Sequence, residues 1–247
     1  MLTNTRSLGV FESAKKAGSV ARIVVTSSVV AIMPPSALHG VPLGDFVIDA
    51  DSRISDLPGP FDDPFSAYVA SKVAALNAGE RWVKEQKPEF DVVTIHPSFI
   101  IGRDDLLDST ASFQDGTNKY ALNTVIGVDV GVPAAPTQHN YVNDTAKAHV
   151  VALDPKVAGN QAFILSSDAT DGMQWNDSQK IAEKHFPDAF QKGVFTKSVS
   201  LGSFDVPLDN SKTEKILGIK ISSYETAAKS VLGHYLELLE EEKKKGK

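Results

Sequence analysis

A tyrosine and a lysine stand four residues apart at Tyr68 and Lys72, in a segment whose apolar spacing predicts a helix. Residues four apart lie one turn apart on the same helical face. An ammonium group beside a phenol stabilises the phenolate, which makes Tyr68 a candidate proton donor to a carbonyl oxygen. The same spacing is common on solvated helices, where such a pair has no chemical role. The pair alone leaves both interpretations open.

The elements around this pair predict an alternation of helices and buried strands. Apolar, β-branched runs at 22–28 and 91–96 show no polar alternation, which is typical of strands covered on both faces of a parallel sheet. Between them, Asp63 followed by Pro64 predicts the start of the helix that carries the pair. The order of these elements predicts an α/β fold with a doubly wound, mostly parallel sheet.

The rest of the chain predicts further helices and one more strand. An apolar turn is expected at 97–102, and a helix after a cap at Asn143 or Asp144. A capping box formed by Ser222 and Glu225 predicts the start of the last helix. The remaining expected elements are a strand at 161–166 and helices at 120–126, 173–185 and 211–217.

Two strand ends and the Tyr–Lys helix should meet at one edge of the sheet. Ser28 ends the first strand and 97–100 follow the second, and open α/β sheets bind ligands outside the carboxyl ends of their strands. The hydroxyls of Ser28 and Tyr68 can hydrogen-bond the same carbonyl oxygen, with the phenol delivering a proton and the serine holding the developing oxyanion. None of these side chains carries a hydride, so the chemistry requires a nicotinamide cofactor.

With these residues in view, the sequence resembles the extended short-chain dehydrogenase/reductase family, also called the NAD-dependent epimerase/dehydratase family. The similarity is to its branch of dihydroflavonol reductases, cinnamoyl-CoA reductases and aldehyde or ketone reductases. The family's Tyr-x-x-x-Lys motif resembles 68–72, its Thr-Ser-Ser strand end resembles 26–28, and its proline turn resembles 96–102. Weaker similarities extend the resemblance over nearly all 247 residues, at 140–149, at 163–167 with Trp175, and at 209–218.

The resemblance implies a role for each candidate residue. Tyr68 would be the general acid/base, Ser28 would orient the carbonyl, and Lys72 would assist Tyr68 and hold the nicotinamide ribose together with it. The cofactor would be NADP(H), because the resembled reductases mostly use it, with NAD(H) as the alternative. The backbone that would meet the nicotinamide is that of Pro97, Ser98, Phe99 and Ile100.

The resemblance also implies a partial Rossmann-like domain. The family opens with a strand and a Gly-x-x-Gly-x-x-Gly turn that holds the pyrophosphate at a helix N-terminus, and the sequence contains neither this motif nor G-x-G-x-x-G. The N-terminal βαβαβ half is therefore expected to be missing, with 1–105 as the remainder of the NAD(P)-binding domain and 106–247 as mainly a small α/β substrate-binding portion. An exposed strand edge at Arg22, weak cofactor binding and a tendency to associate are expected consequences.

The leading prediction is an NAD(P)-dependent oxidoreductase that reduces a small aldehyde or ketone to an alcohol, or runs the reverse reaction. A second interpretation keeps the same fold and the Ser-Tyr-Lys triad but assigns them to nucleotide-sugar epimerisation or dehydration. A third is a truncated relative without catalytic activity that only binds a partner or a dinucleotide. The retained triad favours descent from an enzyme, whereas the missing glycine turn favours an inactive chain.

Composition excludes several other classes. A net charge of −6 and a pI of about 5.5 speak against a nucleic-acid or anionic-membrane surface. No cysteine is present, and the six histidines lack metal-ligand spacing, so no metal is expected. The sequence has no G-x-S-x-G elbow of a serine hydrolase. No apolar run reaches the ~18 residues of a membrane span. The absence of cysteine fits a cytoplasmic protein, and the oligomeric state is left open.

Overall fold

A computed structural model describes residues 2–167 and 172–246, and the chain divides into two compact units. Each unit is assembled from stretches that are separate in the sequence, and Ser28, Tyr68 and Lys72 all belong to the first. The first unit contains Met1–Ser98, Lys147–Leu165 and Pro207–Lys220, and the second contains Phe99–Ala146, Ser166–Val206 and Ile221–Lys247.

The first unit is built on a three-stranded parallel sheet of order β1-β2-β6. Its strands are β1 (Arg22–Thr26), β2 (Asp91–Pro97) and β6 (Gln161–Leu165). The side chains of Val93 and Ile95 in the central strand β2 are fully buried, as expected for a strand covered on both faces. The predicted parallel α/β fold is confirmed.

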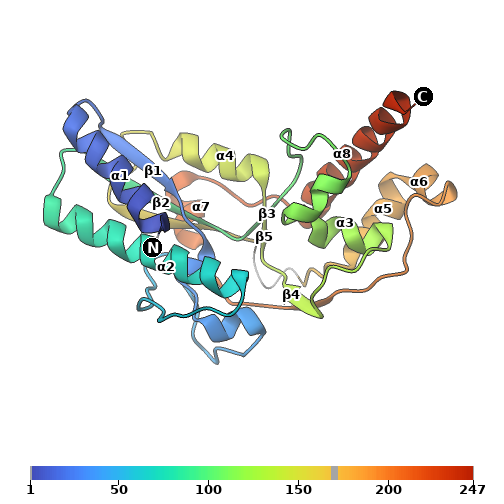
Figure 1. Ribbon diagram of the computed structural model, residues 1–247, viewed down its shortest axis with the longest axis horizontal. Helices are drawn as coiled ribbons and strands as arrows, with labels where there is room; N and C mark the ends of the chain where they lie inside the picture. The colour runs from blue at the N-terminus through green and yellow to red at the C-terminus, as the bar shows by residue number, and fades with distance from the viewer. Residues whose placement is uncertain (1, 168–171, 247) are drawn as a thin grey trace. The chain divides into compact units, whose positions relative to one another are not determined.

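Two helices run side by side along one face of this sheet, α1 (Leu2–Ala17) and α2 (Pro64–Gln86) (Figure 1). The ring of Phe11 in α1 lies 5.5 Å from that of Trp82 in α2 and 6.4 Å from that of Phe90, just before β2. These aromatic contacts hold α2, the helix with the candidate Tyr–Lys pair, on the sheet.

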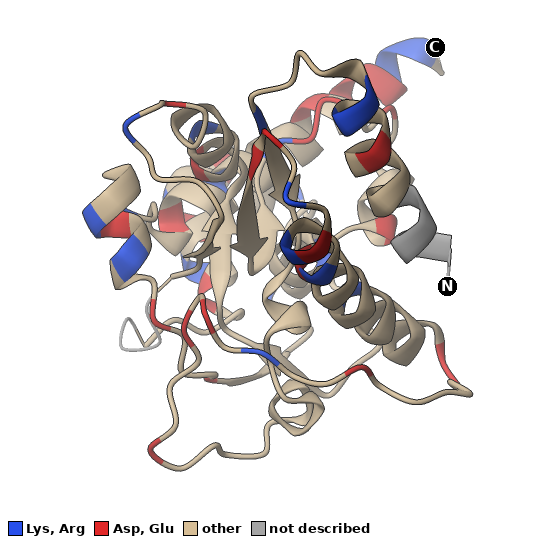
Figure 2. Cartoon of the chain, turned by 90° about the vertical axis from the view of Figure 1, so that its left-hand side faces the viewer, with Lys and Arg blue, Asp and Glu red and all other residues tan. Residues whose placement is uncertain are grey.

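In the view of Figure 2, acidic and basic residues are interspersed along the helices.

The opposite face of the sheet carries α4 (Val142–Val151) and α7 (Ser211–Leu217). His149 of α4 has its Nε2 atom 2.6 Å from the hydroxyl of Thr26 in β1. Lys212 of α7 lies with its ammonium 5.7 Å from the ring centroid of Phe163 in β6. Helices on both faces of the sheet give this unit the three layers of a doubly wound α/β fold.

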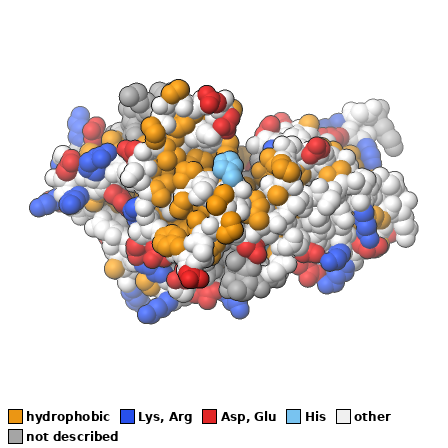
Figure 3. All heavy atoms as spheres, turned by 90° about the horizontal axis from the view of Figure 1, so that it is seen from below, with side chains coloured by type: hydrophobic (Ala, Val, Ile, Leu, Met, Phe, Trp, Pro, Cys, Tyr) orange, Lys and Arg blue, Asp and Glu red, His pale blue; other side chains and the backbone are white. Residues whose placement is uncertain are grey.

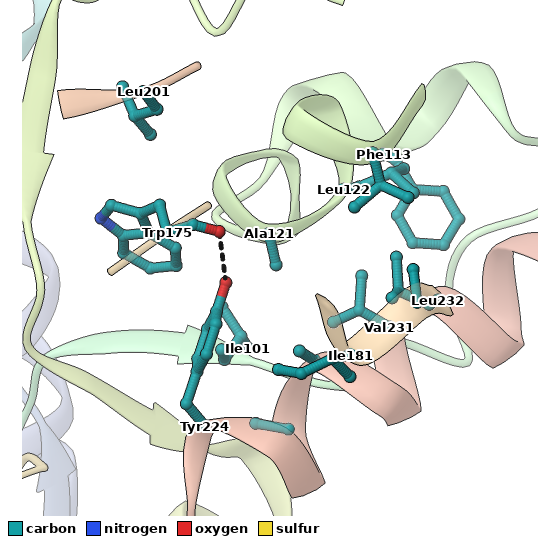
Figure 4. Packing of buried hydrophobic residues seen from close by; sticks show 14 of the residues in the cluster. Ile101, Phe113, Ala121, Leu122, Trp175, Ile181, Leu201, Tyr224, Val231 and Leu232 are labelled. Carbon is teal, nitrogen blue, oxygen red and sulfur yellow. Dashed lines mark hydrogen bonds between the residues drawn. The ribbon is translucent and has the colours of Figure 1, made fainter. Parts of the chain in front are cut away.

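The second unit holds two short parallel strand pairs and a helical core. The pairs are β3 (Phe99–Ile101) with β5 (His139–Tyr141), and β4 (Ala134–Pro136) with β7 (Gly202–Phe204). Its helices are α3 (Asn118–Ile126), α5 (Asp177–His185), α6 (Pro187–Gln191) and α8 (Tyr224–Lys245). Trp175 is buried in the core, and its main-chain oxygen accepts a 3.3 Å hydrogen bond from the Tyr224 hydroxyl (Figure 4).

Two predictions about helix starts are wrong because side chains make tertiary bonds instead of caps. Helix α4 begins at Val142, so Asn143 and Asp144 lie inside its first turn. Asp144 accepts hydrogen bonds from the backbone N–H and the hydroxyl of Ser222, at 2.8 and 3.2 Å. The cap of α8 is therefore not Ser222 but Ser223, whose hydroxyl oxygen accepts the N–H of Thr226.

Two further local predictions need correction. The segment after β2 is not simply a turn, because Phe99–Ile101 forms strand β3 beside a segment forty residues later. The helix expected from residue 173 begins only at Asp177, whose carboxylate accepts the N–H of Gln174 in the preceding turn. No helix within the described ranges is both long enough and apolar enough to cross a membrane.

Candidate active site

Helix α2 starts where the sequence predicts. The Asp63 carboxylate accepts the backbone N–H of Ser66 at 2.9 Å and its hydroxyl at 2.6 Å, and Pro64 occupies the first turn. These hydrogen bonds from Ser66 lower the pKa of the Asp63 carboxyl group. The cap fixes the first turn of α2, immediately before Tyr68.

The Tyr68 side chain is held by its ring, while its hydroxyl remains available. The ring stacks on Phe65 with centroids 6.3 Å apart, and the ammonium of Lys72 lies 5.8 Å from the Tyr68 ring centroid. The side chain is 42% exposed, and its hydroxyl has no hydrogen-bond partner in the part of the chain that the structure describes. The phenol is thus free to meet a ligand.

Lys72 is half-buried, and this burial lowers the pKa of its ammonium group. Among the described residues it has no carboxylate partner. It borders a cavity of about 640 Å³ whose lining also includes Thr26 and Ser27 at the end of β1. A partly desolvated cation without a counter-ion favours negative charge nearby, either on the adjacent phenol or on a ligand oxygen.

Ser28 follows β1 and caps the short 3-10 helix η1 (Val29–Ala31). Its hydroxyl oxygen accepts the backbone N–H of Val30 at 3.3 Å, and the residue is only 8% exposed. Because the oxygen accepts this bond, the hydrogen of the hydroxyl remains to be donated elsewhere. This arrangement suits a group that donates to a carbonyl oxygen.

The turn that carries Ser28 packs against the turn of α2 that carries the Tyr–Lys pair. Val30 of η1 forms a buried cluster with Val69 and Val73 of α2. Val69 follows Tyr68 directly and Val73 follows Lys72, so this cluster ties both elements together on the inner side of the helix. The structure therefore brings the Ser28 turn and the Tyr–Lys pair into one neighbourhood.

The segment from Pro97 to Ile100 leaves the end of β2 with its polar backbone groups largely engaged. Pro97 is the register partner of Leu165, and the N–H and hydroxyl of Ser98 both donate to the Leu165 oxygen, at 2.9 and 3.2 Å. Ile100 belongs to β3, and its carbonyl oxygen accepts the Thr117 hydroxyl. The role of this backbone toward a nicotinamide stays a prediction.

The side chain of Phe99 packs among aromatic residues of its own unit. Its ring centroid lies 4.8 Å from that of Tyr120 and 5.8 Å from that of Trp175. Burial raises the pKa of the Tyr120 phenol. The sequence-based expectation concerned only the backbone of Phe99, so this aromatic contact was missed.

Exposed hydrophobic residues are frequent in the segment that leads to Tyr68. Figure 3 shows hydrophobic side chains gathered on one face of the chain. Such gatherings often mark binding surfaces. The large hydrophobic residues of this segment with the most exposure are Val41, Phe46, Val47, Phe61 and Phe65.

Comparison with known proteins shows what the chain is similar to. No family model matches the chain. The chain is 39% identical over 241 residues to ketoreductase CTB6 of Cercospora beticola, covering 96% of this chain and 66% of that protein. It is 30% identical over 226 residues to the NAD-dependent epimerase/dehydratase ALT6 of Alternaria alternata, covering 86% of this chain and 62% of that protein.

A solved structure extends the likeness to the fold. Yeast methylglyoxal/isovaleraldehyde reductase Gre2, complexed with NADPH, superposes with a TM-score of 0.70 at 22% identity, over 95% of this chain and 70% of that one. The chain belongs to the extended short-chain dehydrogenase/reductase family. It spans just under two thirds of the length of the two curated relatives named above.

Proposed function

We propose that this chain carries the catalytic groups of an NADPH-dependent reductase that converts a small aldehyde or ketone to an alcohol. The supporting observation is an exposed, unpartnered phenol at Tyr68, one turn from the half-buried and unpaired Lys72, on a helix packed against the Ser28 turn. The names of the curated relatives, a ketoreductase and an epimerase/dehydratase, are consistent with hydride chemistry.

The donor set suits the nicotinamide–ribose end of NADPH. The ammonium of Lys72 and the phenol of Tyr68 would hold ribose hydroxyls, and the backbone of Pro97–Ile100 would lie against the nicotinamide. The bound cofactor supplies the hydride. The sequence holds no glycine-rich turn of the family's type for the pyrophosphate, so the residues that fit the cofactor are those at this one end.

The chain's own residues would donate the proton and stabilise the negative charge on the substrate oxygen. Ser28 donates its free hydroxyl hydrogen to the substrate carbonyl, which orients it and stabilises negative charge as it develops. Tyr68 gives its proton to the same oxygen, and Lys72 stabilises the phenolate that remains. Because Tyr68 is 42% exposed, solvent can return the proton for the next cycle.

A reduction assay at millimolar cofactor tests this proposal. Each of two hydride donors is tested with a panel of aldehydes and ketones. The donors are NADPH and reduced nicotinamide mononucleotide, which presents only the nicotinamide–ribose end. We expect carbonyl-dependent oxidation of both donors with matching alcohol formation. Absence of turnover with every donor and carbonyl would refute the proposed reduction.

The relative ALT6 favours a second candidate, epimerisation or dehydration of a nucleotide sugar. Such a reaction returns its hydride to the substrate and consumes no reduced cofactor overall. Conversion of a nucleotide sugar in the presence of NAD, without accumulation of NADH, would favour this candidate over carbonyl reduction.

Replacing Ser28 with alanine is expected to lower kcat about 10²- to 10³-fold, the usual cost of losing one donor to an oxyanion. The control is Ser27→Ala at the adjacent position, because the Ser27 hydroxyl has no hydrogen bond among the described residues. Steady-state kinetics of both variants make the comparison. Equal activity of Ser28→Ala and wild type would remove Ser28 from the reaction.

A further inference from the structure

We propose that His96 is a positioning residue of this site, which holds the carbonyl of Ser28 through its Nδ1–H and thereby aims the Ser28 hydroxyl. The inference rests on the proposed function for its kinetic consequences. Its structural content, the bond between the imidazole and Ser28, stands apart from activity and is tested separately.

The imidazole of His96 lies at the end of β2 and is fully buried. Its Nδ1 atom is 3.1 Å from the main-chain oxygen of Ser28. A carbonyl oxygen only accepts hydrogen bonds, so Nδ1 must carry the hydrogen. In the neutral ring Nε2 is then unprotonated, and this buried atom has no hydrogen-bond partner in the described part of the chain.

Two backbone hydrogen bonds also hold the Ser28 turn. The N–H of Ser27 donates to the oxygen of Ile95 at 2.7 Å, which extends the β1–β2 ladder by one bond. The Ser28 carbonyl also accepts the N–H of Ala31 at 3.0 Å, a bond local to η1. The bond from His96 is therefore the link that ties the Ser28 carbonyl itself to the neighbouring strand.

This link helps to fix the orientation of Ser28. The hydroxyl oxygen is occupied by the N–H of Val30, and the carbonyl is held from two sides. The hydroxyl hydrogen of Ser28 makes no hydrogen bond among the described residues, so it can be donated to a substrate. Loss of the imidazole N–H would leave the Ser28 carbonyl tied only within its own turn, and the hydroxyl would no longer be held in one direction.

Burial keeps the imidazole neutral. It lowers the pKa of His96 to about 4, against an opposing effect of the hydrogen bond to Ser28. The charged groups that act on the ring are Arg53, which lowers its pKa further, and Asp51, which raises it. Between pH 5 and 8 the ring should therefore keep its single hydrogen on Nδ1.

Two substitutions at His96 separate the effect of losing the N–H donor from the effect of losing the volume of the ring. His96→Asn places an amide N–H near the position of Nδ1, whereas His96→Leu retains apolar volume without a donor. We expect His96→Leu to lower kcat about 10- to 100-fold, with the KM for cofactor changed less than twofold, because a small misalignment of a reacting group has effects of this size. We expect His96→Asn to recover most of the loss. Equal losses in both variants would overturn the positioning role.

Nitrogen-15 NMR of the folded chain tests the structural claim without any turnover. The imidazole of His96 should show a protonated Nδ1 and an unprotonated Nε2 at pH 7, and the side-chain couplings of Ser28 should report one rotamer. That rotamer should persist in His96→Asn and average in His96→Leu. An Nε2–H tautomer, or an unchanged Ser28 rotamer in His96→Leu, would refute the inference. The expected NMR result without reductase activity would instead refute only the proposed function.

The same burial predicts a pH-dependent stability. The native pKa lies below the ordinary value of ~6.5, so the native state binds fewer protons and is most stable above that pH. Stability should fall as the pH drops from 6.5 toward 4, and the folding equilibrium constant should decrease by about two orders of magnitude from this group. Denaturant titrations at several pH values measure this, and His96→Asn should show a shallower dependence. An equal slope in that variant would contradict the assignment.

Discussion

Replacing Tyr68 with phenylalanine is expected to lower kcat for carbonyl reduction about 10²- to 10⁴-fold, the usual contribution of a general acid. The substitution removes only the phenolic oxygen, and the ring can keep its contacts with Phe65 and Lys72. Folding should therefore be unchanged, since the hydroxyl has no hydrogen bond within the described residues. The measurement is steady-state turnover with saturating carbonyl substrate.

A tyrosine outside the site provides the matched control. The hydroxyl of Tyr141 accepts an exposed hydrogen bond from Asn143 at 3.1 Å, so Tyr141→Phe removes a comparable group. We expect turnover within about twofold of wild type in this variant. If Tyr68→Phe were as active as Tyr141→Phe, the phenol of Tyr68 would not be the proton donor.

Replacing Arg22 with alanine is expected to lower the free energy of unfolding by about 3–5 kcal/mol, the range for breaking a largely buried ion pair. The guanidinium contacts both carboxylate oxygens of Asp91, at 2.5 and 2.8 Å, and donates to the carbonyls of Ala152 and Val157 at 2.7 and 2.8 Å. The Arg22 side chain is 11% exposed and that of Asp91 is 29% exposed. Loss of the guanidinium would leave the Asp91 carboxylate at the start of β2 and three carbonyls of the segment 152–157 without this donor.

A second arginine pair gives the control for that prediction. Arg53 contacts the carboxylate of Glu80 in a more exposed position, with 29% and 45% of the two side chains accessible. Arg53→Ala should cost about 0.2–1 kcal/mol, because water and salt screen an exposed pair. Urea unfolding of the two variants compares them. A cost for Arg22→Ala as small as that for Arg53→Ala would show that the Arg22–Asp91 contact does not stabilise the sheet.

The sheet and the helix of the site could be predicted because their signals are local. The β-branched run of β1 and the apolar stripe of α2 are regular patterns of buried residues that can be read along the sequence. Asp63 and Pro64 mark the start of α2 through hydrogen bonds and backbone angles that involve neighbouring residues only. Strand β3 could not be predicted this way, since it is formed by pairing with β5 from a distant segment. The start of α8 was displaced by one residue because Ser222 bonds to Asp144 instead.

For the candidate site, too, local spacing could be predicted from the sequence, whereas side-chain contacts could not. Spacing alone placed Tyr68 and Lys72 on one helical face, and the structure has the Lys72 ammonium beside the Tyr68 ring. The contact of Phe65 with Tyr68 and the bond of His96 to Ser28 depend on side-chain directions that spacing does not specify. For His96, the available signal was its position at a strand end, level with the two serines after β1.

The central claim is that Tyr68 protonates a carbonyl oxygen while hydride reaches the carbonyl carbon. Incubation of the chain with NADPH that carries deuterium in place of both hydrogens at C4 of the nicotinamide, followed by mass spectrometry of the alcohol, tests this most directly. We predict one deuterium on the former carbonyl carbon, formed by wild type and nearly lost in Tyr68→Phe. An alcohol without deuterium, or equal amounts of labelled alcohol from both proteins, would contradict the account.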